Sequence, residues 1–251
     1  MRIHEFGTEH EKTVLLLHSA CLSWRMFRPA VERLQTQYHL IIPALPAHDP
    51  DEKTPYTSVE AIAAELGGWL TQRGIGALWG LYGVSMGGAV ALRLLADGKI
   101  PVRTCVLDAA ITPYRAPRWL TRGFSLRNYL VIRFAQRHLA LIRRAFPSQR
   151  FGQTAVEDVC TILGRMDRRD VWRVFDSCFH YPLPKRLQMT ARVSYWYGSK
   201  EYSQRALDIH HVCRLLPEAV FVAFPDCAHA EFVAGQPEAF AARLVETLER
   251  D

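Results

Sequence analysis

One serine of this chain lies between glycines at a spacing that suits nucleophilic catalysis. The pentad Gly83-Val84-Ser85-Met86-Gly87 follows an apolar run at 78–84 and opens a helix-like run at 86–97. A G-x-S-x-G pentad in this context is typical of a sharp turn from strand to helix, which strains the serine backbone and leaves no room for side chains at the glycines. Chance produces such pentads in roughly a few per cent of chains this long. The flanking pattern favours function, and we interpret Ser85 as the candidate nucleophile.

A serine hydroxyl attacks efficiently only when a base takes its proton and an acidic group orients that base. His229 is the candidate base, because it follows the predicted strand at 219–224 by a short loop and would emerge at the same end of the sheet as Ser85. Two carboxylates could orient it, since each lies at the end of a predicted strand between the serine and the histidine. Loop geometry favours Glu201, and Asp108 stays open as the alternative acid.

The tetrahedral intermediate of acyl transfer carries a negative oxygen that needs two N–H donors. The N–H group of Met86, directly after the candidate nucleophile, would supply one of them. The second should come from the loop HSACLSW, in which Ala20 or Cys21 is suitably placed. We interpret His18, the first residue of this loop, as a brace for the loop and not as a base.

The elements that position these residues alternate along the chain. Apolar patterning predicts strands at residues 2–6, 13–18, 38–43, 78–84, 102–108, 193–198 and 219–224. It predicts helices at residues 26–37, 59–73 with Ser58 as N-cap, 86–97, 203–216 and 237–248. The alternation indicates an α/β fold with a mostly parallel, doubly wound sheet.

Residues 113–189 break this alternation. They are helical in pattern, rich in arginine and without a convincing strand, yet too apolar to be disordered. We therefore expect a core formed by residues 1–112 and 190–251, with a helical cap inserted between them.

Composition narrows the functional classes. The net charge is +6, and most arginines lie between residues 115 and 186. These arginines could bind nucleic acid, an anionic substrate or a membrane surface. Because no nucleic-acid motif accompanies them, we favour the interpretation that they are the solvated faces of surface helices.

No apolar run is long enough for a membrane span or a signal peptide, so we expect a cytoplasmic protein. The six cysteines are scattered without zinc spacing, which predicts free thiols and no metal or organic cofactor.

Five stretches together resemble the α/β-hydrolase superfamily, and they cover essentially the whole chain. They are VLLLHSACLSWRMF, IIPALPAH, YGVSMGGAVALRL, YWYGSKE and FPDCAHAEFVAGQPEAF. The resemblance implies that Ser85, Glu201 and His229 are the nucleophile, acid and base, in the family's order along the chain. It also implies oxyanion donors at Ala20 and Met86, and a helical cap that roofs the active site.

Three departures from the family pattern concern the loops around the site. The usual His-Gly after the early strand is His18-Ser19 here, and the usual Gly-His-Gly is replaced by Ala47-His48-Asp49. The acid is a glutamate in place of the commoner aspartate. None of these departures removes a member of the triad, but they leave the subfamily open.

The predicted activity is hydrolysis of a small or medium hydrophobic carboxylic ester through an acyl-enzyme. One alternative is a C–C hydrolase, a thioesterase or a menaquinone-pathway-like lyase acting on an anionic substrate held by cap arginines, since YGSKEYSQRAL faintly resembles those lyases. Another is a non-catalytic ligand receptor on a hydrolase fold. The expected partner is a small-molecule ester and not a nucleic acid, and the sequence does not predict an oligomeric state.

Two features of the cap bear on the substrate. Aromatic residues that could line an acyl pocket, or equally form the core of the cap, include Trp119, Phe124, Trp172 and Phe175. Residues 125–146 mix apolar residues with arginines, as in a basic helix that approaches lipid surfaces or anionic acyl substrates. We favour the alternative that this helix packs its apolar side on the pocket and turns its arginines to water.

Overall fold

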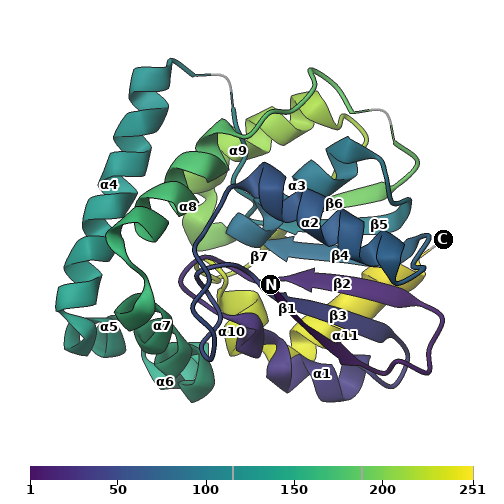
Figure 1. The fold of residues 1–251 in the computed structure, drawn as a ribbon, viewed down its shortest axis with the longest axis horizontal. Helices are drawn as coiled ribbons and strands as arrows, with labels where there is room; N and C mark the ends of the chain where they lie inside the picture. Colours follow the sequence, from purple (N-terminus) through teal and green to yellow (C-terminus); the bar gives the residue numbers. More distant parts are fainter. Residues whose placement is uncertain (115, 188, 251) are drawn as a thin grey trace.

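A seven-stranded sheet in the order β1-β3-β2-β4-β5-β6-β7 forms the centre of the computed structural model (Figure 1). The structure describes residues 1–114, 116–187 and 189–250. Only β1 runs antiparallel to its neighbour, so the sheet is mostly parallel, as predicted. The strands are β1 (Arg2–Phe6), β2 (Thr13–Leu17), β3 (His39–Ala44), β4 (Leu78–Val84), β5 (Val102–Asp108), β6 (Arg192–Gly198) and β7 (Val220–Phe224).

Helices cover both faces of the sheet, which explains the nearly continuous apolar character of its central strands. On β2, Leu15 and Leu17 join the core beneath one set of helices, while Val14 and Leu16 join the core on the opposite face. The first face is covered by α2 (Val59–Gln72), α3 (Met86–Asp97) and α9 (Tyr202–Leu215), and the second by α1 (Arg28–Leu34) and α11 (Pro237–Glu249) (Figure 1).

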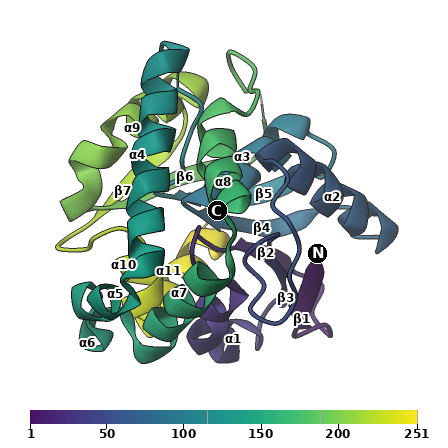
Figure 2. The same ribbon diagram turned by 60° about the vertical axis from the view of Figure 1, so that its left-hand side comes forward.

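Five helices follow β5 and precede β6, and they lie together beyond one side of the sheet (Figures 1 and 2). They are α4 (Arg118–Arg137), α5 (Leu139–Ala145), α6 (Ser148–Phe151), α7 (Gln153–Arg165) and α8 (Arg168–His180), and we call them the cap helices. The insertion expected at residues 113–189 includes positions 115 and 188, which lie outside the described residues. Within the described part of the chain, no helix combines the length and apolar character that crossing a membrane would require.

Three short elements differ from the sequence prediction. The helix expected at 26–37 is divided into the 3-10 helix η1 (Trp24–Phe27) and α1, which has Pro29 in its first turn. A second 3-10 helix, η2 (Ser199–Glu201), and the five-residue helix α10 (Glu231–Gly235) were not predicted. Segments this short carry too few residues for a periodic signal.

The turn from β4 to α3 allows almost no space at its glycines. A Cβ atom on Gly87 would lie 2.2 Å from the carbonyl oxygen of Leu17, and one on Gly83 would lie 2.4 Å from the carbonyl oxygen of Gly87. Both contacts are with backbone atoms, so neither can be relieved by a change of rotamer. The pentad is therefore required by packing between β2, β4 and α3.

We expect Gly87→Ala to lower the free energy of unfolding by about 3 kcal/mol, because the added methyl group forces β2 away from α3. Urea unfolding measures this loss. The matched control is Gly68→Ala in α2, where a Cβ atom would have no described heavy atom within 4 Å. That substitution should gain about 0.5–1 kcal/mol from helix propensity. Equal stability of the two variants would contradict the packing argument.

Candidate active site

Ser85 connects β4 to α3 without an intervening loop. Its backbone has φ 54° and ψ −112°, a combination that L-residues adopt only under constraint. The constraint comes from β5 and its following loop: the Ser85 N–H donates to the carbonyl oxygen of Asp108 at 2.8 Å, and the Ser85 carbonyl oxygen accepts from the N–H of Ile111 at 3.2 Å. Ser85 is the N-cap of α3, but its side chain makes no capping hydrogen bond. The hydroxyl therefore remains available at the amino end of the helix.

The imidazole of His229 is held by Glu201. Nδ1 of His229 lies 2.6 Å from Oε2 of Glu201, and Oε1 of Glu201 accepts the N–H of Gly198 at 3.0 Å. Burial opposes ionisation of Glu201, but the bonds from His229 and Gly198 outweigh it and lower the pKa of this carboxyl. An ionised Glu201 places the proton on Nδ1, so Nε2 of His229 is the basic nitrogen.

The loops that carry Glu201 and His229 are packed directly on one another. The N–H of Lys200 donates to the carbonyl oxygen of Cys227 at 3.0 Å. A Cβ atom on Gly198 would lie 2.3 Å from the same oxygen, so this approach requires glycine. The short η2 turn then places Glu201 beneath the imidazole of His229.

Asp108, the alternative acid, has a different partner. Its Oδ2 accepts the hydroxyl of Tyr82 at 2.5 Å. Burial raises the pKa of Asp108 to about 6, although the Tyr82 hydrogen bond works against this rise. The geometry thus pairs His229 with Glu201, while Asp108 supports the backbone of Ser85 from below.

The loop after β2 brings backbone groups to the serine. Ala20 and Cys21 line the same cavity as Ser85, and Cys21 has a positive φ of 63° in a turn closed by the Leu22 N–H and the Ser19 carbonyl oxygen. Met86 is the first residue of α3, whose first N–H groups have no acceptor within the helix. Burial raises the pKa of the Cys21 thiol to about 12, which keeps it protonated beside the serine.

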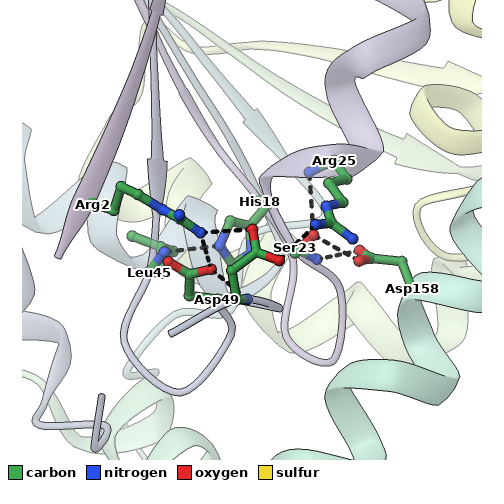
Figure 3. A network of polar contacts seen from close by, with 8 residues as sticks. Arg2, His18, Ser23, Arg25, Leu45, Asp49 and Asp158 are labelled. Carbon is green, nitrogen blue, oxygen red and sulfur yellow. Dashed lines mark hydrogen bonds and ion pairs between the residues drawn. The ribbon is translucent and has the colours of Figure 1, made fainter. Parts of the chain in front are cut away.

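His18 braces this loop from beneath (Figure 3). Its Nε2 accepts the N–H of Leu45 at 3.0 Å, which leaves Nδ1 to donate to the carbonyl oxygen of Ser19 at 2.9 Å. Burial, with a smaller contribution from neighbouring His48, lowers the pKa of His18 to about 3. The ring is therefore neutral at physiological pH and joins the loop after β2 to the loop after β3.

A carboxylate from the cap holds the other end of the same loop (Figure 3). Asp158 of α7 is 5% exposed, and its two oxygens accept the Ser23 N–H at 2.6 Å and the Ser23 hydroxyl at 2.7 Å. The Ser23 hydroxyl in turn accepts the N–H of Arg25. The sequence prediction missed Asp158: Ser23 has the local signature of a helix cap, but nothing near residue 158 indicates its distant partner.

Ser85 and His229 line one cavity of about 300 Å³ between the sheet and the cap helices. Apart from Ser19, Cys21 and these two residues, the lining is apolar, and it includes Ile132, Ala135, Val156, Leu163 and Phe175. No charged side chain is among the described residues that line it. A larger cavity of about 410 Å³ lies at the opposite, amino ends of β6 and β7, remote from the serine.

The structure brings only one of the four predicted pocket aromatics to this cavity, namely Phe175. Trp119 is 76% exposed on α4, Phe124 packs against Phe179, and Trp172 packs against Tyr129. Which aromatic residues reach the cavity depends on how α4 and α8 are rotated about their own axes, and the amino-acid composition does not predict that rotation.

Among the described residues, no group of three or more His, Cys, Asp or Glu side chains is arranged to hold a metal ion.

Comparison with known proteins identifies similar folds. A family model described as "Alpha/beta hydrolase family" matches residues 14–243. An alpha/beta hydrolase family protein from Desulfitobacterium hafniense is 23% identical, with TM-score 0.75 and coverage of 99% of this chain and 100% of that one. A thermophilic esterase from Thermogutta terrifontis is 20% identical, with TM-score 0.71 and coverage of 98% and 91%.

A further similar structure is MenH from S. aureus, which is 17% identical, with TM-score 0.70 and coverage of 99% of this chain and 97% of that one. No curated protein sequence matches the chain. At these identities the structural likenesses show a shared fold and do not transfer a substrate.

We expect Asp158→Ala to lower the free energy of unfolding by about 2 kcal/mol, because it leaves the buried N–H and hydroxyl of Ser23 without their charged acceptor. Thermal or urea unfolding measures the change. Glu157→Ala, one residue earlier on the exposed side of α7, is the matched control and should stay within about 0.5 kcal/mol of the parent protein. A loss no greater than that of the control would show that the Asp158 contact does not hold the loop.

Proposed function

Because the chain belongs to the alpha/beta hydrolase family, we propose that it is a serine hydrolase that cleaves small or medium hydrophobic carboxylic esters through an acyl-enzyme at Ser85. The observation that carries this proposal is the position of Ser85 and His229 on one apolar cavity, with Nδ1 of His229 held 2.6 Å from Glu201. These three residues are the proposed triad, and the cap helices are the proposed roof of the site.

The proposed reaction begins when Oγ of Ser85 attacks the ester carbonyl carbon and Nε2 of His229 takes the hydroxyl proton. Glu201 keeps the imidazole in the required tautomer and stabilises its positive charge. The N–H groups of Met86 and Ala20 bind the oxyanion, and the positive end of the α3 dipole favours the same charge. The C–O bond then breaks, and His229 donates its proton to the leaving alcohol. Water activated by His229 hydrolyses the acyl-enzyme in the second half-reaction.

The cavity supports a neutral, hydrophobic acyl group. Its volume of about 300 Å³ lies at the lower end of the usual range for ligand pockets, roughly 300–1,000 Å³. An anionic substrate held by cap arginines, as in a menaquinone-pathway-like lyase, finds no support in a lining without charged side chains. Turnover rates of an ester and a thioester with the same acyl group distinguish carboxylesterase from thioesterase activity. Turnover of either substrate excludes a receptor without catalysis.

A fluorophosphonate should label Ser85 covalently, because the reagent phosphonylates a serine, with loss of fluoride, only when a base activates it. Peptide mapping by mass spectrometry locates the adduct. Ser19 also lines the cavity and serves as an internal control that should remain unlabelled. Ser85→Ala should abolish both labelling and ester turnover. Full turnover by this variant, or an adduct on Ser19 alone, would reject the mechanism.

The two candidate acids are separable by isosteric substitution. Glu201→Gln should lower kcat by about 10⁴-fold, because without the carboxylate the proton of His229 is no longer held on Nδ1 and the imidazole loses the required tautomer. Asp108→Asn retains an oxygen that can accept the Tyr82 hydroxyl, and we expect its kcat to fall by less than about tenfold. Steady-state kinetics on one soluble ester measures both values. The reverse ranking would assign the acid role to Asp108.

A further inference from the structure

The outer face of the cap carries an apolar stripe, formed by Trp119, Leu126, Leu130 and Phe134 of α4. These side chains are 76%, 48%, 56% and 58% exposed. Their spacing of seven, four and four residues places them on one side of the helix. Of the ten large hydrophobic side chains that are exposed in the described part of the chain, seven lie between Trp119 and Phe146.

The side of α4 that faces the protein combines small residues with the half-buried Phe124, Tyr129 and Ile132, which pack on the core. Its buried positions are Thr121, Ser125 and Ala135. The hydroxyl of Thr121 lies 2.9 Å from Nε2 of His180 in α8, and the Ser125 hydroxyl donates to the Thr121 carbonyl oxygen. The expectation that this helix packs its apolar side on the pocket holds for Ile132 and Ala135, which line the cavity. It does not hold for the four residues of the apolar stripe, which face outward. The contact between α4 and α8 also includes the ring pairs Phe124–Phe179 and Tyr129–Trp172.

The apolar stripe is continuous with the mouth of the candidate active site. Val131 and Phe146 line the cavity and are 58% and 39% exposed, so the cavity opens on this face of the cap. Leu130 and Phe134 of the stripe lie beside Val131 along α4. A hydrophobic molecule bound at the stripe therefore lies next to the apolar lining of the cavity that contains Ser85.

The chain segment that carries the stripe has charges of one sign. Between Asp108 and Glu157 the chain contains nine arginines and no acidic residue. Arg150 forms an ion pair with Glu231 of α10. Within the described ranges, the arginines of α4 and α5 form no ion pair with an acidic side chain; they are Arg118, Arg122, Arg127, Arg133, Arg137, Arg143 and Arg144. A helix with exposed apolar residues between arginines has the character of a helix that lies in the headgroup region of an anionic bilayer.

We propose that α4 and α5 dock the protein on an anionic lipid surface, with the cavity mouth at Val131 and Phe146 facing the lipid. A second copy of the chain fits this face less well, because a two-fold contact would bring two arginine-rich surfaces together without acidic partners. A convex helix also offers no groove for a folded protein, whereas lipid headgroups adapt to its shape. Delivery of substrate from the lipid rests on the proposed ester hydrolysis, but docking itself does not.

The test is co-sedimentation with vesicles of phosphatidylcholine mixed with phosphatidylglycerol, compared with vesicles of phosphatidylcholine alone. We expect binding to the mixed vesicles that weakens as salt is added, because salt screens the arginines. The stripe variant Leu126→Ser/Leu130→Ser/Phe134→Ser and the charge variant Arg137→Gln/Arg143→Gln/Arg144→Gln should each weaken binding, the latter on the order of a hundredfold. The control Tyr202→Ser/Leu207→Ser removes exposed apolar side chains from α9 and should bind as the parent protein does.

Three results would overturn the proposal: no binding to mixed vesicles, equal binding to both kinds of vesicle, or equal binding by the stripe variant and the parent protein. A dimer in light scattering that the stripe variant dissociates, without vesicle binding, would assign the face to a second copy instead. Turnover of a soluble ester should be unchanged in the stripe variant, whereas turnover of an ester embedded in mixed vesicles should fall with binding. Vesicle binding without turnover of any ester would retain the docking surface and reject the proposed function.

Discussion

The strained turn at Ser85 is the constraint on which the rest of the structure depends. A residue with a side chain adopts φ 54° and ψ −112° only when its surroundings compensate for the strain. Here β5 supplies a backbone acceptor through Asp108, and the segment after β5 supplies a donor through Ile111. Gly87 adds a close backbone contact with β2. The parallel strands β2, β4 and β5 therefore converge on one residue, and their carboxyl ends must lie at one edge of the sheet.

Buried polar groups then fix the loops that leave this edge. His18, Asp158 and Glu201 are all nearly inaccessible to solvent, and each satisfies backbone N–H or C=O groups of a loop near Ser85. Burying such groups costs free energy unless their hydrogen bonds are made, so each one favours a single loop conformation over its alternatives. The site thus gains rigidity from polar contacts in places where an apolar core cannot reach.

The sequence predicts the parts of this fold that depend on local pattern. The elements β4, α3 and β5 match their predicted bounds: β4 ends at the pentad, α3 ends before Gly98, and β5 ends at Asp108. Contacts between distant segments have no local signature, which is why Asp158 could not be predicted as the partner of Ser23 across 135 residues. The 26–37 prediction failed for another reason: Ser23 caps a 3-10 turn first, and Pro29 suits the first turn of a new helix.

Helix α4 shows a further limit of periodicity. Its large apolar residues are divided between two sides, which amphipathicity alone does not predict: Phe124, Tyr129 and Ile132 pack inward, while the residues of the apolar stripe are exposed. The cap is anchored mainly by α7 and α8, each of which buries six residues, among them Ile162, Leu163, Val171 and Val174. By contrast, α4 buries three of its 20 residues, namely Thr121, Ser125 and Ala135. The exposed apolar stripe therefore belongs to a helix that contributes little to the buried core of the cap, while α7 and α8 hold the cap on the sheet.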